Sequence, residues 1–142
     1  MTQNNLERFT GAQQADYATA LSEVKNGRKR SHWMWYIFPQ IQGLGYSSIS
    51  KHYAIRNLRE AEEYLRHPVL GSRLTEISAA LLGLESNDAY RIFGTPDDLK
   101  LKSSMTLFAA VPGADPVFEQ VLQKFFRGVK DESTLQIIGT QQ

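Results

Sequence analysis

Cationic and aromatic residues adjoin one another between residues 27 and 45, which read GRKRSHWMWYIFPQIQGLG. A basic run at residues 28–30 is followed by four aromatic residues within six positions: Trp33, Trp35, Tyr36 and Phe38. Lysine and arginine side chains hold phosphate oxygens, and aromatic faces stack on flat rings. The segment therefore indicates a site for a phosphate-bearing ligand, in which Lys29 and Arg30 bind the phosphate and Trp33 or Trp35 stacks on the ring.

Three further features of this segment bear on the same site. His32 stands between the cations and the tryptophans, and it is the candidate general acid or base because imidazole exchanges protons near neutral pH. Gln40 is expected either to read a polar edge of the ligand or to cap a helix. Gly43 and Gly45 can bring backbone amides close to an anion. Their spacing lacks the third glycine of the dinucleotide fingerprint, so they do not predict a dinucleotide site.

A second unusual segment, residues 100–108, reads KLKSSMTLF. On a helix, Lys100, Ser103 and Ser104 share one side, because successive residues turn by about 100°. Lys100 is a candidate anion-binding residue, and the two serines are candidate catalytic or orienting hydroxyls. The order Lys-x-x-Ser is the reverse of the Ser-x-x-Lys nucleophile motif, so that motif is not matched. Serines inside helices also commonly donate to the carbonyl four residues earlier, and this alternative stays open.

Both segments have other interpretations. The aromatic residues are equally consistent with a buried core, and the basic run with an exposed turn. A protein-interaction module that uses Trp33–Phe38 is the alternative function, because Trp, Tyr, Met and Arg are enriched at interfaces. Nucleic-acid binding through residues 28–30 is the weakest hypothesis, since the net charge is only +1.

Composition excludes several classes of site. The chain has 142 residues and no cysteine, which excludes disulfides, thiolate nucleophiles and cysteine-ligated metals. Neither His52 nor His67 has a second ligand three or four residues after it, so no metal site and no cofactor are expected. No apolar run approaches the ~20 residues of a membrane helix, and no secretory signal begins the chain. We expect a cytoplasmic protein whose partner is an anionic small molecule rather than a membrane or a nucleic acid. Whether it is an enzyme, and its oligomeric state, stay open.

Apolar spacing predicts mostly helices. Repeats of three and four residues predict helices over about 13–26, from the low fifties to 66, and over 69–84. Thr95 and Asp115, each before a proline, are expected to cap two further helices, one ending near Phe108 and one at Gly128. A short helix is expected over 131–138. The predicted fold is all-α, one compact domain of six to seven helices over residues 1–142, with its core at about 6–138.

Specific motifs spread over nearly the whole chain carry a family resemblance. They are residues 27–40 and 43–45, Glu60-Ala61, Tyr64-Leu65, residues 67–71, Arg73-Leu74, Phe93-Gly94 and residues 100–108. From about Leu6 to Leu135 the chain resembles the mainly bacterial family named domain of unknown function 1810. The resemblance implies a compact all-helical domain and supplies no reaction. It points to residues 29–40 and 100–108, the two segments that composition also distinguishes.

Members of that family are sometimes labelled calpastatin. Inhibitors of the calpastatin type are disordered and poor in aromatic residues. This chain is 42% hydrophobic and 11% aromatic, so its composition does not support that label.

Overall fold

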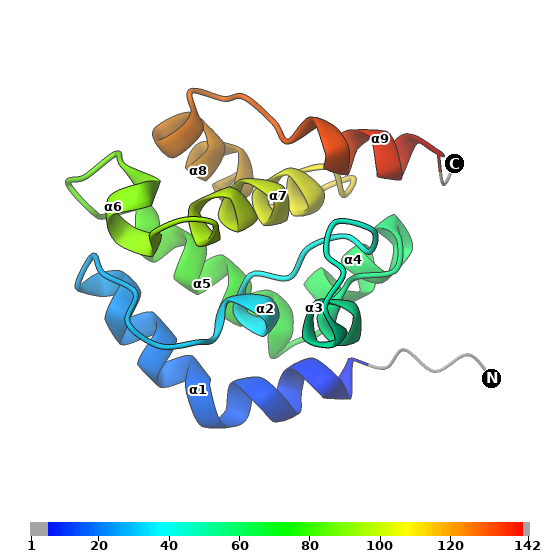
Figure 1. Cartoon of the computed structure of the whole chain (residues 1–142), viewed down its shortest axis with the longest axis horizontal. Coiled ribbons are helices and arrows are strands. Elements are labelled where there is room, and N and C mark those ends of the chain that lie inside the picture. The colour runs from blue at the N-terminus through cyan, green and yellow to red at the C-terminus, as the bar shows by residue number, and fades with distance from the viewer. Residues whose placement is uncertain (1–5, 141–142) are drawn as a thin grey trace.

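Nine helices occupy residues 6–140, the part of the chain that this computed structural model describes (Figure 1). Their bounds are α1 (Glu7–Lys25), α2 (Met34–Ile37), α3 (Ser48–Tyr53), α4 (Leu58–Arg66), α5 (Leu70–Leu82), α6 (Ala89–Phe93), α7 (Asp97–Ala109), α8 (Val117–Phe126) and α9 (Glu132–Thr140). The all-α class is confirmed, but the predicted number of six to seven helices is too low. Helices α2, α3 and α6 have only four to six residues, too few for a recognisable apolar stripe.

The helix expected from the low fifties to Arg66 is in fact two helices, α3 and α4. Between them Ile55 is extended and forms an isolated parallel bridge with Ile41. The Ile55 N–H donates to the Gln40 carbonyl at 2.8 Å, and the Gln42 N–H donates to the Ile55 carbonyl at 2.8 Å. Asn57 then caps α4 by accepting from the Glu60 N–H at 2.8 Å. The bridge fixes the chain after Gln40 against the start of α4.

The two caps that proline patterns predict have different outcomes. The Asp115 carboxylate accepts from the Val117 N–H at 2.8 Å and so satisfies the first N–H of α8, although the N-cap residue itself is Pro116. The predicted cap at Thr95 is wrong, because Pro96 itself stands at the N-cap of α7, with φ −89° and ψ 10°, and no side chain caps there. Helix α7 therefore begins one residue later than the sequence pattern predicts. The Asp98 carboxylate accepts from the N–H of its neighbour Leu99 at 2.9 Å.

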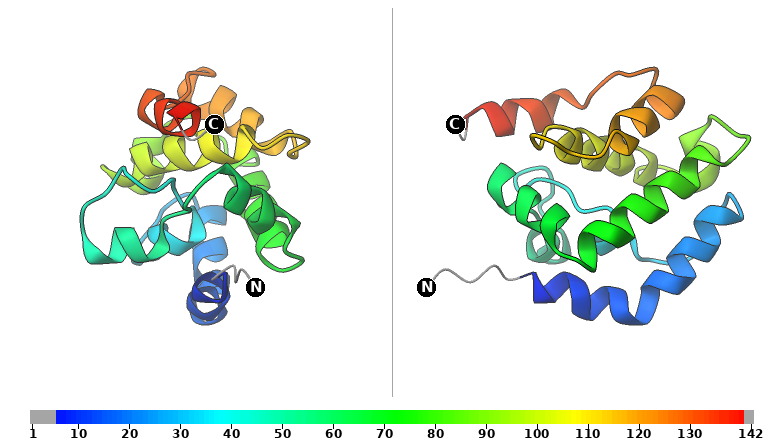
Figure 2. Two further views of the ribbon diagram at one scale, coloured as in Figure 1. Left: turned by 90° about the vertical axis from the view of Figure 1, so that its right-hand side faces the viewer. Right: turned by 180° about the vertical axis from the view of Figure 1, so that it is seen from behind.

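Aromatic rings connect the helices through the centre of the molecule. Helices α1 and α9 lie along opposite sides, with α5 and α7 between them (Figures 1 and 2). The ring of Phe9 on α1 meets that of Tyr64 on α4 at 5.2 Å between centroids. Tyr64 meets Phe108 on α7 at 5.3 Å, and Phe108 meets Phe118 on α8 at 5.9 Å. These four buried side chains join α1, α4, α7 and α8 into one core.

The helices of the described chain were compared with the requirements for a membrane-spanning helix. Within residues 6–140, none of them combines the length and the apolar character that crossing a bilayer requires.

The crossing of α4 and α5 depends on Gly71. A Cβ atom at this position would overlap the carbonyl oxygen of Leu65, at the end of α4. We expect Gly71→Ala to lower the free energy of unfolding by about 2 kcal/mol or more, because one of the two helices must move. Gly139→Ala is the matched control, since Gly139 in α9 has open space around it. This control is expected to stabilise by about 0.5–1 kcal/mol. Urea unfolding of both variants makes the comparison, and equal stabilities would contradict the close approach.

Candidate ligand-binding site

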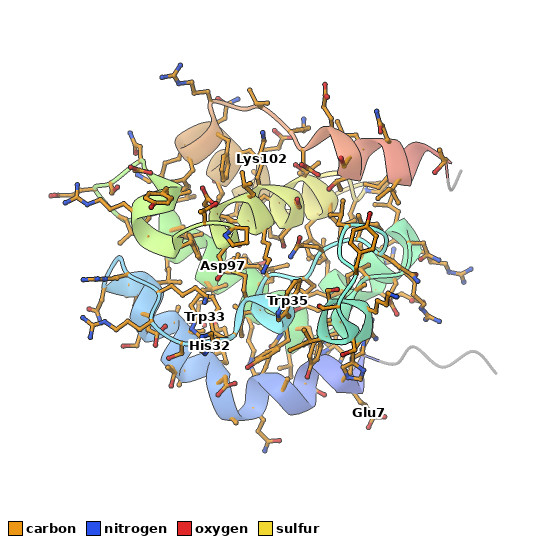
Figure 3. All side chains as sticks on the ribbon, viewed as in Figure 1. Glu7, His32, Trp33, Trp35, Asp97 and Lys102 are labelled. Carbon is orange, nitrogen blue, oxygen red and sulfur yellow. The ribbon has the colours of Figure 1, made fainter. Side chains whose placement is uncertain are left out.

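The carboxylate of Asp97 brings the two unusual segments together. Its Oδ2 lies 2.9 Å from the Lys29 ammonium, and its Oδ1 lies 3.1 Å from the Lys100 ammonium. The Lys29 side chain is only 9% exposed, whereas that of Lys100 is 20% exposed. Figure 3 shows Asp97, the first residue of α7, next to the segment that carries Trp33 and Trp35. Residues 29–40 and 97–104 therefore meet at one ion-pair cluster.

Each of these lysines also lies over a tryptophan ring. The Lys29 Nζ is 5.0 Å from the ring centroid of Trp33, and the Lys100 Nζ is 3.8 Å from that of Trp35. Such contacts are worth about 0.5–2 kcal/mol, depending on how far water is excluded. Lys29 additionally donates to the Ser31 carbonyl at 2.6 Å, so its ammonium is held by protein groups on several sides. Lys29 therefore positions the segment, and Lys100 is the more accessible cation.

A second carboxylate, Glu23 on α1, fixes the turn before Trp33. It accepts from the N–H groups of Arg30 and Ser31 at 2.8 and 3.0 Å, and from the Ser31 hydroxyl at 2.6 Å. The Trp33 indole N–H donates to the same carboxylate at 2.9 Å. Desolvation alone would raise the pKa of Glu23, but these donors outweigh it and lower the pKa from 4.5 to about 2. The carboxylate stays ionised and anchors the turn to α1.

Burial separates the aromatic residues of this segment into two groups. Trp33, Tyr36 and Phe38 are core residues, and the Trp33 ring packs against Phe38 and Phe93 at centroid distances of 6.2 and 6.4 Å. Only Trp35 is partly exposed. Trp33 is thus placed as a structural residue, and Trp35 is the one tryptophan whose ring a ligand can reach. Among the neighbouring cations, Arg28 and Arg30 are exposed.

A narrow cavity of about 20 Å³ lies beside Trp35. It is lined by residues 40–45, Trp35, Ser50, Lys51, Tyr53 and Ala54. The Gln40 Nε2 atom is buried there and has no hydrogen-bond partner within the described chain. Buried amide donors in proteins are almost always satisfied, by protein, water or a ligand. An unpaired donor in a cavity next to an aromatic ring is the feature of this molecule that points most directly to a bound molecule.

Glycine is required where the chain forms the wall of this cavity. A Cβ on Gly45 would lie 2.5 Å from the Ser50 hydroxyl oxygen, a distance that real Cβ atoms do not show. Gly43 has φ +109°, and a Cβ there would lie 3.3 Å from Ile137 of α9. The Gly-Leu-Gly sequence thus lets the loop pass close to α3 and α9. Gly43 and Gly45 therefore both line the cavity.

The three candidate catalytic residues are not brought to this cavity. His32 is exposed, and its carbonyl accepts from the Tyr36 hydroxyl at 3.3 Å. The Ser103 hydroxyl donates to the Leu99 carbonyl at 3.2 Å, which is the structural alternative raised by its helical position. Ser104 is fully buried, one turn along α7 from Lys100, and its hydroxyl has no partner in the described structure. None of the three lines the cavity beside Trp35.

Sequence reasoning missed the two carboxylates that organise the site. Glu23 is a single acid inside an amphipathic helix, and nothing in its spacing connects it with residues 30–33. The sequence around Asp97 indicates only an acidic residue in the first turn of a helix, which is common there and does not predict an ion pair with Lys29. Glu23 contacts residues seven to ten positions later, and Asp97 pairs with the distant Lys29. These contacts become visible only when α1 and α7 are placed against residues 29–35.

Comparison with known proteins identifies the family. Residues 3–138 match the model of the family described as "Protein of unknown function (DUF1810)". The chain belongs to this family. A crystal structure of the conserved hypothetical protein Rv1873 from Mycobacterium tuberculosis is 43% identical in sequence, with 95% of this chain and 96% of that chain covered and a TM-score of 0.93. No curated protein matches the chain. The DUF1810 resemblance inferred from the motifs is therefore confirmed, together with the helical fold.

In this DUF1810 protein, removing the charge of Asp97 tests the ion-pair cluster. Asp97→Asn leaves the Lys29 ammonium largely buried without its carboxylate, so we expect a loss of about 2 kcal/mol in the free energy of unfolding. Asp98→Asn is the matched control, because the described contact of the Asp98 carboxylate is with the Leu99 N–H alone. The control substitution is expected to lower the free energy of unfolding by less than about 0.5 kcal/mol. Urea unfolding followed by tryptophan fluorescence compares the two, and equal losses would refute the cluster's role.

The lowered pKa of Glu23 predicts a pH-dependent contribution to stability. Its native pKa lies below its ordinary value, so the stabilisation is fully present above about pH 4.5 and is lost as the pH falls towards 2. The stability difference between wild type and Glu23→Gln should therefore be large at neutral pH and shrink across this window. Urea unfolding at several pH values measures it. Glu85→Gln, at an exposed position, serves as the control. A difference that does not change with pH would contradict the role of the ionised carboxylate.

Proposed function

We propose that this protein binds a phosphate-bearing small molecule, such as a nucleotide or a NAD-derived metabolite, at the cavity beside Trp35. The observation that carries the proposal is the buried Gln40 amide nitrogen, which has no partner in the described chain. A donor left unpaired away from water costs about 1–3 kcal/mol. A hydrogen-bond acceptor on a ligand, such as a ring nitrogen or a carbonyl oxygen, removes this cost when it enters the cavity.

The size of the cavity limits which part of the ligand enters it. Its volume of about 20 Å³ holds one water-sized group. The edge of a ring therefore reaches Gln40, while the rest of the molecule lies outside. Trp35 lies at the wall, where its ring provides an apolar surface for that edge.

Cations near the cavity favour a phosphate on the same ligand. Lys51 lines the cavity, and the Lys100 ammonium lies 3.8 Å from the Trp35 ring centroid. Lys29 contributes indirectly, because it shares Asp97 with Lys100 and so holds that side of the site in place. Arg30 is exposed on the neighbouring turn. An ammonium next to an aromatic wall matches a charged group joined to a flat ring.

We propose binding and no catalytic step, because His32, Ser103 and Ser104 do not line the cavity. The alternative, a protein-interaction module using Trp33–Phe38, is not favoured by any contact in the structure. Most of its aromatic side chains are buried in the core, so they offer little surface to a partner.

Thermal-shift and calorimetric titrations with AMP, ADP-ribose and inorganic phosphate test the proposal. We expect one or more of these compounds to raise the melting temperature of the wild type. Gln40→Leu should weaken nucleotide binding about tenfold, while the unfolding free energy stays equal or rises, since an unsatisfied buried donor is removed. Gln120→Leu, at an exposed position on α8, is the matched control and should bind as the wild type does.

The two readouts separate a ligand-binding glutamine from a structural one. If Gln40→Leu unfolds more easily and binds normally, Gln40 serves the fold and the proposal is wrong. Absence of binding of all three compounds to the wild type at millimolar concentration would also reject it.

A further inference from the structure

A wider recess adjoins the cavity beside Trp35. It has a volume of about 330 Å³ and is lined by Arg8, Gln42, Lys51, His52, Ala54 and Arg56. Small-molecule pockets commonly hold about 300–1,000 Å³, so the recess suits a small metabolite. Gln42, Lys51 and Ala54 line both the recess and the narrow cavity, so the two hollows share a wall.

The charge of the recess follows from Glu60, which lies beneath two arginines. This carboxylate is 2% exposed and lies 3.2 Å from the Arg8 guanidinium and 3.0 Å from that of Arg56. It also accepts from the Arg56 backbone N–H at 2.9 Å. One buried anion therefore faces two guanidinium groups, and Lys51 adds a third positive charge at the wall. Among the described residues that line the recess, Lys51 is an exposed cation, and an exposed cation attracts anions.

Arg8 holds the backbone around the recess in place and also contributes a positive charge. Its guanidinium donates to the carbonyls of His52 and Ala54 at 2.8 and 2.7 Å, and so ties α1 to the chain between α3 and α4. The Arg8 side chain is nearly buried, whereas the Arg56 side chain is about half exposed. Lys51 and His52 are exposed on the rim. The cations that an incoming anion meets first are therefore Lys51 and Arg56.

Resting on the proposed function, we infer that this recess holds the phosphate of the ligand whose ring edge reaches Gln40. The ligand class is then a molecule with an uncharged hydrogen-bonding ring at one end and a phosphate at the other. Lys51 is the pivotal residue, because it lines both hollows and thus lies between the two ends of the ligand. Arg56, which Glu60 holds at the wall of the recess, has a half-exposed guanidinium, a group that suits phosphate oxygens. The sequence motifs predict phosphate contacts at Lys29, Arg30 and Lys100, whereas this inference places the phosphate at α3 and the chain after it.

Charge reversal at Lys51 tests the inference, with AMP as the probe. Lys51→Glu is expected to weaken AMP binding at least about tenfold, and the loss should be smaller at high ionic strength, because salt screens exposed charges. Arg91→Glu is the matched control, because this substitution changes the net charge by the same amount. Arg91 is exposed on α6, at the other end of the molecule from α3 (Figure 1). The control should change AMP affinity less than about twofold. Both positions are exposed, so both variants are expected to fold.

The outcomes distinguish this inference from the proposed function. If Gln40→Leu weakens AMP binding and Lys51→Glu does not, the cavity binds the ligand and the recess is not its phosphate site. If Lys51→Glu and Arg91→Glu weaken binding equally, only overall charge matters, and the inference is again overturned. If AMP does not bind the wild type and neither do the other two compounds, the proposed function fails and the inference fails with it. Selective loss in Lys51→Glu supports it.

Discussion

The shared carboxylate of Asp97 is the contact on which the arrangement around Trp35 depends. Lys29 and Lys100 come from segments seventy residues apart, and two like charges this close repel unless an anion lies between them. Asp97 supplies that anion at low exposure, where screening by water and salt is weak. The position of Lys100 over Trp35 follows, because the ammonium is held to Asp97 on one side and to the indole on the other.

Side-chain contacts take the place of regular structure in the segment that carries the site. Between the end of α1 and the start of α3 the described chain forms only the four-residue helix α2 and an isolated bridge at Ile41. Backbone hydrogen bonds alone therefore cannot position this stretch. Glu23 fixes its beginning, Asp97 fixes it against α7, and the buried rings of Trp33 and Phe38 hold its middle in the core. The aromatic and charged residues of this segment supply these anchors.

The lengths of the helices and the origin of these anchors explain which parts of the fold and of the candidate site the sequence predicts. Apolar periodicity predicts the long helices well, since an amphipathic stripe needs two or more turns to be visible. For the same reason it misses α2 and α6 and does not separate α3 from α4. Composition selects Trp35, Gln40 and Lys100 of the candidate site, but it selects Trp33 as well, because a core ring and an accessible ring have the same residue type. Lys51 and Arg56 carry no sequence signal, since they line one recess with Arg8 only when α1 lies against the chain around α3.

Two buried side-chain polar atoms of the described residues lack a hydrogen-bond partner, the Gln40 Nε2 atom and the Ser104 hydroxyl. Gln13 shows the usual case: its amide nitrogen is buried and donates to the Tyr36 carbonyl at 2.7 Å and to the Tyr64 hydroxyl at 2.9 Å. An apolar side chain of similar size at position 40 would avoid the cost of the unpaired donor, so stability of the chain alone does not account for glutamine there. An acceptor from outside the chain does account for it. Under the proposed function, this acceptor belongs to a phosphate-bearing ligand, and the adjoining recess is the proposed place of its phosphate.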